Sequence, residues 1–244
     1  MKSKKGIIIA VVIWSLIWEV LAKFIGNEIY LPQPLEVLKK ILKICTEENF
    51  VINISKTLIT SIISFSLAVI LSVIIGMCSS FNKYVYNFIY PLVAILKSIP
   101  TIIVILIALI WLDKEYVSFL VGIMIVFPLL YELVVKSIID TDVAILEMTK
   151  IYKIKLYDKI KTIYYPQIQR EILNMGSSSF SLVLKLIIAS EVYSQPSYGI
   201  GALVQGAKIN FDMVGIFAWT VIIILISIFV DILFKIMHKS LKRV

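Results

Sequence analysis

Six stretches of this 244-residue chain are apolar and long enough to cross a lipid bilayer as helices. A helical span needs about 20 mostly apolar residues. Apolar residue types make up 60% of the sequence, above the roughly 45–50% that is usual in soluble domains. We therefore predict an all-α membrane protein with about six transmembrane helices, which form a single domain over residues 1–244. The spans are expected at about residues 7–25, 58–77, 84–112, 117–135, 172–189 and 214–237.

The net charge of +8 comes from lysines and arginines that lie between or beyond the apolar stretches. This distribution follows the tendency of cytoplasmic loops to be basic, so it indicates a membrane protein rather than a nucleic-acid-binding one. An even number of spans brings both termini to one side. We expect a multi-pass protein of the cell membrane with cytoplasmic termini, whose basic tail residues are Lys2, Lys4, Lys5, His238, Lys239, Lys242 and Arg243.

Prolines and glycines predict where the chain turns or its helices break. Leu31–Pro34 reads as an extended corner, because proline disfavours helix in the residue before it, and residues 35–44 read as a short amphipathic helix on the outer face. Pro91 and Pro100 are expected to break the third span. After the fifth span, Gly199 and Gly201 predict a tight outer loop that either meets a binding protein or is a plain turn.

A basic amphipathic segment, residues 142–166, separates the fourth and fifth spans. Its apolar and charged residues alternate at helical spacing, which is typical of a helix that rests on a surface or a partner. Asp142 is a suitable N-cap for a first helix, and Pro166 is expected to stop a second one. We predict a rigid cytoplasmic helix-turn-helix, the coupling hairpin, which docks either on a partner protein or on lipid headgroups.

Charged residues inside the spans are candidates for a transport path, since a charge at the bilayer centre is costly and usually faces a cavity or a partner. Lys97, Ser98 and the helix-breaking Pro100 are expected to line the path or its gate. The alternative is that Lys97 snorkels to the surface or pairs with a carboxylate. The fifth span contains Ser181 and Lys185 and ends near Glu191. The last two are six residues apart on a helix, so they point to different faces and do not form a mutual pair.

The sequence offers no sign of catalysis. It has no phosphate-binding G-x-x-x-x-G-K-[ST] motif, and Cys45 and Cys78 do not have the spacing of a metal site. The single histidine, His238, lies in a basic tail. We predict that the chain is not an enzyme and that it holds no cofactor or metal.

Several motifs resemble those of the permease subunits of binding-protein-dependent ATP-binding-cassette importers. The cytoplasmic signature of that family, E-A-A, three residues, G, nine residues, I-x-L-P, is matched in part by Glu147-Met148-Thr149, Lys153 and Ile163-Tyr-Tyr-Pro166. Further stretches fall in the family's order, and together they look like the branch that includes aliphatic-sulfonate, taurine, nitrate and thiamine-precursor permeases. These stretches are Leu31–Pro34, Leu96–Pro100, Ala189–Glu191 and Tyr198–Gly201.

The resemblance implies that the hairpin docks in a groove of an ATPase subunit. The residues at or near that contact would be Glu147, Met148, Thr149, Ile151, Tyr152, Lys153, Ile163 and Pro166. Lys153 replaces the family's glycine, and it enters a left-handed turn less easily. The bend between the two helices is therefore expected elsewhere, or to be shallower.

The resemblance also implies an assembly. Two permease copies, expected as a homodimer, would line one path, with ATP and magnesium held by two ATPase subunits and substrate delivered by an extracytoplasmic binding protein. The residues assigned to the path or gate are Lys97, Ser98, Pro100, Ser181, Lys185 and Glu191, for a small anionic or polar solute such as a sulfonate. The alternative function is an ion-coupled or unpowered transporter or channel, which predicts internal repeats with paired broken helices; we find no second copy of the hairpin pattern.

Overall fold

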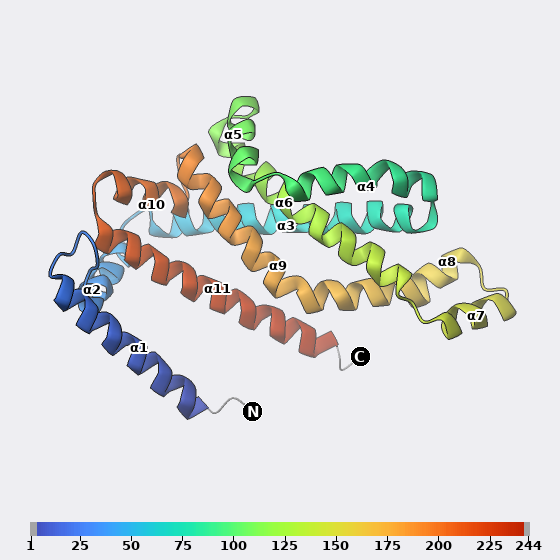
Figure 1. The fold of residues 1–244 in the computed structure, drawn as a ribbon, viewed down its shortest axis with the longest axis horizontal. Helices are drawn as coiled ribbons and strands as arrows, with labels where there is room; N and C mark the ends of the chain where they lie inside the picture. The colour runs from blue at the N-terminus through green and yellow to red at the C-terminus, as the bar shows by residue number, and fades with distance from the viewer. Residues whose placement is uncertain (1–3, 242–244) are drawn as a thin grey trace.

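The computed structural model describes the backbone of residues 4–241 and the side chains of residue 6 and residues 9–236. Every regular element in this range is a helix, which confirms the all-α fold (Figure 1). The side chains of the predicted basic tails, Lys2, Lys4, Lys5, His238, Lys239, Lys242 and Arg243, lie outside the described residues. The helices are α1 (Lys4–Ile25), α2 (Pro34–Cys45), α3 (Phe50–Phe81), α4 (Lys83–Ser98), α5 (Thr101–Trp111), α6 (Lys114–Ile139), α7 (Val143–Ile151), α8 (Leu156–Lys159), the π-helix η1 (Ile160–Tyr164), α9 (Tyr165–Ser194), α10 (Ile200–Ile209) and α11 (Met213–Leu241).

The helices account for the predicted membrane spans. Among the described residues, α3, α6, α11 and the continuous segment Leu156–Ser194 are each long and apolar enough to cross a membrane. The pair α4 and α5 bends by 103° between its two helices, and it forms either a broken fifth span or a re-entrant loop. The 22-residue α1 has the length of a sixth. The predicted all-α membrane fold is therefore confirmed, with four or five candidate spans among the described residues, and the count of six stays a prediction.

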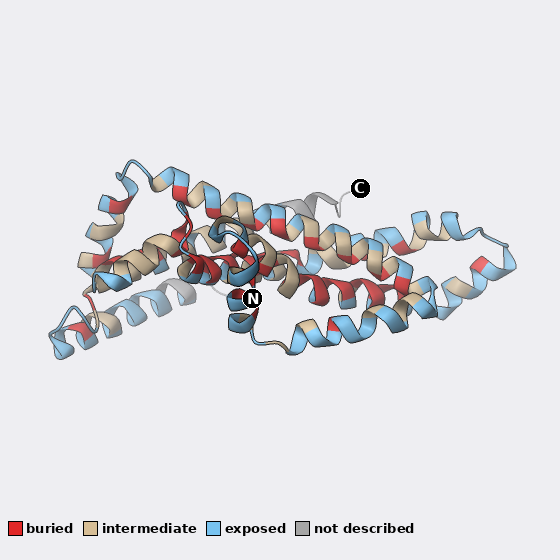
Figure 2. Ribbon diagram, turned by 90° about the horizontal axis from the view of Figure 1, so that it is seen from above, coloured by how far each residue is buried: buried red, intermediate tan, exposed pale blue. Residues whose placement is uncertain are grey.

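Helices α3, α6 and α9 form the centre of the bundle, where most of the buried residues lie (Figure 2). The face of α3 that meets its neighbours carries small side chains at helical spacing, which let the backbones approach closely. The Ser72 hydroxyl donates to the carbonyl of Phe127 at 3.0 Å. A Cβ added to Gly76 would lie 2.7 Å from Val134. The small residues of this face are Ser61, Ser64, Ala68, Ser72 and Gly76.

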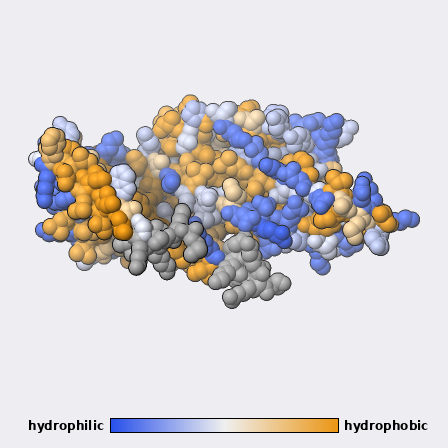
Figure 3. Space-filling model, turned by 60° about the horizontal axis from the view of Figure 1, so that its bottom comes forward, coloured by the Kyte–Doolittle hydropathy of each residue, from blue (hydrophilic) through white to orange (hydrophobic). Residues whose placement is uncertain are grey.

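Large apolar side chains cover much of the outside of the bundle. Helix α1 exposes Val20 and Trp14, and α11 exposes Phe229 and Leu225. Figure 3 shows such side chains gathered at the end of the molecule that holds α1. A surface of this kind is typical of helices that face lipid, where apolar side chains meet hydrocarbon instead of water.

Two expectations about prolines were wrong. Pro91 lies inside α4 and does not break it, and only Pro100 separates α4 from α5. Pro166 does not stop the second arm of the hairpin, because the helix continues from Leu156 to Ser194. The π-helical turn η1 directly precedes this proline, with the Tyr165 amide donating to the Ile160 carbonyl. A wider turn at this point accommodates a ring that would otherwise clash with the preceding turn of an α-helix.

The segment after α9 also differs from the prediction. Residues 200–209 form the helix α10, where the sequence indicated only an outer loop. This helix packs mainly on α9 and α11 (Figure 1). The corner at Leu31–Pro34 and the amphipathic helix that follows it are found as predicted, with α2 beginning at Pro34.

Candidate functional site

The coupling hairpin, residues 142–166, consists of α7, a short turn, α8, η1 and the first residues of α9. Asp142 caps α7 as predicted, since its Oδ1 accepts a hydrogen bond from the Ala144 amide at 2.9 Å. Lys153 forms the turn with a φ of 49°, in the left-handed region. The amides of Lys153 and Ile154 donate back to the carbonyls of Lys150 and Thr149 at 3.1 and 3.0 Å. This pattern is a Schellman motif, which usually has glycine at the left-handed position.

The expectation that Lys153 would move or flatten the bend was therefore wrong. The two returning hydrogen bonds satisfy carbonyls at the end of α7 that have no partner within the helix. A lysine adopts the left-handed conformation at a modest cost, which these bonds offset. The bend lies at the position where the family signature has glycine.

The hairpin is fixed to the bundle by its own apolar contacts. Ile160, Ile163 and Leu146 pack against a buried cluster that contains Val134 and Ile138 of α6. Tyr164 of η1 belongs to the same cluster and meets Phe81 at the end of α3, with ring centroids 5.2 Å apart. The Thr141 hydroxyl donates to Gln167 at 3.1 Å. The hairpin is therefore packed on α6 and α9 together.

The outward side of the hairpin exposes a set of large apolar side chains, which we call the hairpin tip. Ile151 and Tyr152 are 75% and 72% exposed. Figure 2 shows this end as mostly exposed, and Figure 3 shows hydrophobic and hydrophilic side chains next to each other there. The hairpin tip comprises Val143, Ile145, Met148, Ile151, Tyr152, Leu156 and Tyr157, and the lysines around it are Lys150, Lys153, Lys155 and Lys161.

The residues predicted for ATPase contact fall into two groups. Glu147, Met148, Ile151, Tyr152 and Lys153 are exposed on the hairpin, and Pro166 is exposed on the first turn of α9. Thr149 is buried, with its hydroxyl bonded to the Leu146 carbonyl at 2.7 Å. Ile163 faces the internal cluster. In this conformation Thr149 and Ile163 support the hairpin from inside and are not part of its outer surface.

Lys97 forms an ion pair with Glu132 of α6, at 2.6 and 2.7 Å from the two carboxylate oxygens. This is the carboxylate pairing that the sequence left open as an alternative. The pair lies at a cleft of about 310 Å³, which is also lined by Ser98 and Tyr90. Paired charges inside a membrane bundle balance each other and remain accessible from the cleft.

A second cleft, of about 360 Å³, lies between α6 and α9 and shares Glu132 with the first. Its other polar residues are Lys136, Ser178 and Ser179. Sequence reasoning did not single out Glu132 or Lys136, although Glu132 lies within the predicted fourth span. A charged residue inside a hydrophobic span was the signal that could have identified it. We call the two clefts together the polar track.

The other predicted path residues are more scattered. Ser98 donates to the Ile95 carbonyl at 2.9 Å, and Pro100 is the N-cap of α5 at the 103° bend. Ser181 is half-buried on α9 and does not line either cleft, and Lys185 is exposed on the same helix. Glu191 lies apart from Lys185, as their spacing predicted.

Glu191 is buried at the end of α9, where it caps the first turn of α10. Its Oε2 accepts a hydrogen bond from the Gly201 amide at 2.9 Å, and both of its oxygens accept from the Thr57 hydroxyl. Thr57 in turn accepts from the Ile200 amide at 2.9 Å. Asn53 of α3 accepts from the Gly199 amide at 2.8 Å. Glu191, Thr57 and Asn53, from α9 and α3, therefore satisfy the amides at the start of α10 that have no partner within the helix.

The two glycines of this turn leave room for the carboxylate. A Cβ on Gly199 would lie 2.7 Å from the Glu191 carboxylate carbon, and one on Gly201 would lie 2.3 Å from the Ile188 carbonyl. Gly199 also has a φ of 156°, which L residues rarely adopt. The predicted motif of glutamate followed by two glycines is thus a packing unit that fixes α10 to α9 and α3.

The sequence profile of the family described as "Binding-protein-dependent transport system inner membrane component" matches residues 68–243. The chain belongs to this family. It is therefore a membrane transport permease and not an enzyme. The matched part of the permease includes the coupling hairpin, the polar track and the Glu191 cap.

Other known proteins are similar to the permease. The formylaminopyrimidine transport permease protein ThiX of Halalkalibacterium halodurans is 27% identical over 95 residues, which are 39% of this chain and 38% of that relative. The permease thus aligns with little more than a third of this curated relative. Two inward-facing structures of the MetNI methionine ABC transporter share the fold. The first has a TM-score of 0.69 and 12% sequence identity, and the match covers 78% of this chain and 94% of that chain. The second has a TM-score of 0.61 and 10% sequence identity, and the match covers 76% of this chain and 91% of that chain.

Proposed function

We propose that the permease is the transmembrane subunit of an ATP-driven importer, in which the hairpin tip binds a separate ATPase subunit. The single observation that supports this most is the exposed apolar hairpin tip on a hairpin fixed to α6 and α9. An exposed apolar patch with a polar rim is typical of a protein–protein contact. The lysines around the tip would favour an acidic rim on the partner's groove.

Helix length favours a protein partner over lipid for the tip. The continuous helix Leu156–Ser194 has 39 residues, and at 1.5 Å per residue it is roughly 58 Å long. The hydrocarbon core of a bilayer is only about 30 Å thick. The first turns of this helix, and the hairpin attached to them, therefore project out of the membrane when the rest of the helix spans it.

The proposed mechanism follows from how the hairpin is anchored. Closure of the ATPase subunits on ATP would push the tip, and the cluster around Val134 and Ile138 would pass the push to α6 and α9. Both helices line the polar track, so their movement would change access to Lys97 and Glu132. This is alternating access, in which ATP and substrate shift the populations of two states.

In this proposal the transport path consists of the polar track, which includes Ser98, together with Pro100, Ser181 and Lys185. Helix α10 and its Glu191 cap would close the end of the path that lies away from the hairpin. The cargo would be a small polar or anionic solute, delivered by an extracytoplasmic binding protein to a pair of permease copies. The motif resemblance favours a sulfonate, and the name of the ThiX relative favours formylaminopyrimidine. The hairpin would lie in the cytoplasm, with both termini on the same side.

Co-purification with the ATPase subunit tests this function. We expect Ile151→Asp to abolish recovery of the ATPase, because it places a charge in the apolar contact, and Glu147→Arg to weaken it. Phe211→Asp is the matched control, since Phe211 is 77% exposed and lies between α10 and α11. Equal recovery in all three variants would contradict the proposal. An ion-coupled or unpowered transporter, the alternative, would transport normally without any ATPase.

A further inference from the structure

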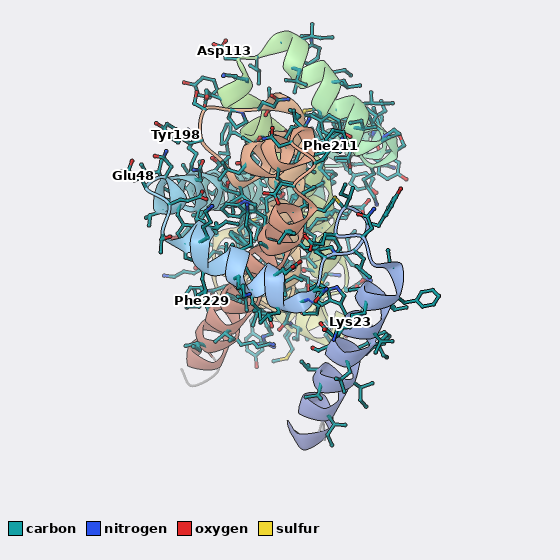
Figure 4. All side chains as sticks on the ribbon, turned by 90° about the vertical axis from the view of Figure 1, so that its left-hand side faces the viewer. Lys23, Glu48, Asp113, Tyr198, Phe211 and Phe229 are labelled. Carbon is teal, nitrogen blue, oxygen red and sulfur yellow. The ribbon has the colours of Figure 1, made fainter. Side chains whose placement is uncertain are left out.

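Helix α2 lies across the end of the bundle instead of along it. Figure 4 looks along the long axis of Figure 1, and α2, in pale blue, runs across this view. Its position is fixed by Lys40, whose Nζ contacts the Asp212 carboxylate at 2.6 Å just before α11 begins. Helix α2 therefore lies at the level where a spanning helix enters the membrane. At this depth a helix meets both acyl chains and lipid headgroups.

One face of α2 is part of the bundle. Val37 and Ile44 are each 2% exposed, and they belong to the buried cluster that contains Ala218, Trp219 and Ile222 of α11. Ile41 packs against the same cluster. These contacts hold α2 firmly and determine which of its side chains point away from the protein.

The opposite face of α2 is also apolar, and no described residue covers it. Leu35, Leu38 and Leu42 are 60%, 57% and 70% exposed. Their spacing of three and four residues places them on one stripe of the helix. Lys39 and Lys43 follow the second and third leucines by one residue, so they form an adjoining stripe. Both lysines are exposed, and neither has a salt bridge to any described residue.

We propose that this outer face of α2 binds the anionic phospholipids of the bilayer interface. The leucine stripe would enter the acyl-chain region, and Lys39 and Lys43 would contact headgroup phosphates. The charge pattern selects this occupant, because a lysine stripe beside a leucine stripe complements a surface that is apolar below and negative above. The exposed part of this face has no tryptophan, tyrosine or arginine, the residues that usually anchor a protein partner.

Cys45 at the end of α2 allows a direct test, because it is exposed and the only other cysteine is Cys78. The full-length permease carrying Cys78→Ser is labelled at Cys45 with a fluorophore and reconstituted into phosphatidylcholine vesicles that contain brominated lipid. We expect brominated phosphatidylglycerol to quench the label about 25-fold more effectively per molecule than brominated phosphatidylcholine, since each of the two lysines near an anionic surface contributes roughly a fivefold preference. Aqueous iodide should quench weakly.

The variant Lys39→Gln/Lys43→Gln should lose the preference for phosphatidylglycerol and retain quenching by lipid. The matched control is Lys83→Gln/Lys114→Gln, two exposed lysines at the starts of α4 and α6, helices that do not pack on α2, whose loss should leave the preference unchanged. Equal quenching by both brominated lipids in the unmodified α2 would overturn the selectivity. Strong quenching by iodide that ends only when a binding protein is added would overturn the lipid assignment in favour of a protein partner.

Discussion

The hydroxyl of Thr57 on α3 donates to both carboxylate oxygens of Glu191 on α9, at 3.0 Å each. The same hydroxyl accepts the Ile200 amide, so one small side chain joins three helices at the buried start of α10. A carboxylate next to the first turn of a helix also interacts favourably with the helix dipole. This arrangement explains why α10 is a helix rather than a loop, and it leads to the first prediction.

Thr57→Val should destabilise the permease by about 2 kcal/mol, because it removes one of the two donors to the buried Glu191 carboxylate and leaves the buried Ile200 amide without its acceptor, while keeping the side-chain shape. Thermal unfolding of the purified protein measures this. Thr220→Val is the control, since the Thr220 hydroxyl is exposed and bonds only within α11. An unfolding temperature equal to that of the wild type would show that Thr57 does not support α10.

Gly201→Ala tests the same turn by steric means. The added methyl group would lie 2.3 Å from the Ile188 carbonyl, a backbone atom that cannot move aside alone. We expect a loss of at least about 3 kcal/mol, or a permease that does not accumulate in the membrane. Gly206→Ala is the matched control on the same helix, because nothing lies within 4 Å of its added Cβ. Normal stability of Gly201→Ala would mean that α10 is not packed on α9 as described.

Lys153→Gly should stabilise the coupling hairpin by roughly 0.5–1 kcal/mol, because glycine adopts the left-handed turn without the steric cost that lysine has. Hydrogen exchange of the hairpin amides is the measurement. The control is Lys155→Gly, at a φ of −66°, where glycine only adds freedom to the unfolded chain and should destabilise. Faster exchange in Lys153→Gly than in the wild type would contradict the Schellman turn.

The ion pair between Lys97 and Glu132 predicts different results for stability and transport. Lys97→Met should lower both, since Glu132 then lacks its partner near the bilayer core. The double variant Lys97→Glu/Glu132→Lys restores the pair but reverses its polarity in the cleft. We expect its unfolding temperature to recover and its uptake to stay about tenfold reduced, the equivalent of about 1.4 kcal/mol. Full recovery of uptake would show that the pair is structural only.

Stability below about pH 4 should depend on Asp212, which lies outside the spans. Partial burial alone would raise the pKa of its carboxyl, but the hydrogen bonds from Lys40 and Gly215 and the lysine charges lower it overall. Because its pKa is lower in the folded state, the Asp212 carboxylate stabilises the fold at pH values above its ordinary pKa of 3.8. That stabilisation is lost as the pH falls through the lower pKa of the folded state. Asp212→Asn should therefore be less stable than the wild type at pH 7, and the difference should disappear in acid. A difference that does not change with pH would contradict this assignment.

Local patterns in the sequence were enough to predict much of this fold. Apolar runs predicted the spans, Asp142 predicted the start of α7, and the proline-containing corner at Leu31–Pro34 predicted where α2 begins. These features depend on nearby residues only. The missed features depend on distant ones: Pro166 is tolerated because of the π-turn before it, and α10 forms because Thr57 and Asn53 satisfy its first amides.

The candidate site shows the same division. The exposed hairpin tip follows from helical spacing, whereas the partner of Lys97 lies 35 residues away on another helix. Spacing along the sequence could identify both charges as unusual but could not pair them. Likewise the position of Lys153 in a left-handed turn depends on returning hydrogen bonds that only the folded hairpin makes.

The central claim is that the hairpin tip contacts an ATPase subunit, and photo-crosslinking at Tyr152 tests it most directly. A photoreactive amino acid replaces Tyr152, which is 72% exposed, in the assembled transporter, and the same replacement at Phe211 serves as the control. The account predicts a crosslink from position 152 to the ATPase subunit and none from position 211. Crosslinks from position 152 to phospholipid alone, in an assembly that contains the ATPase, would contradict it.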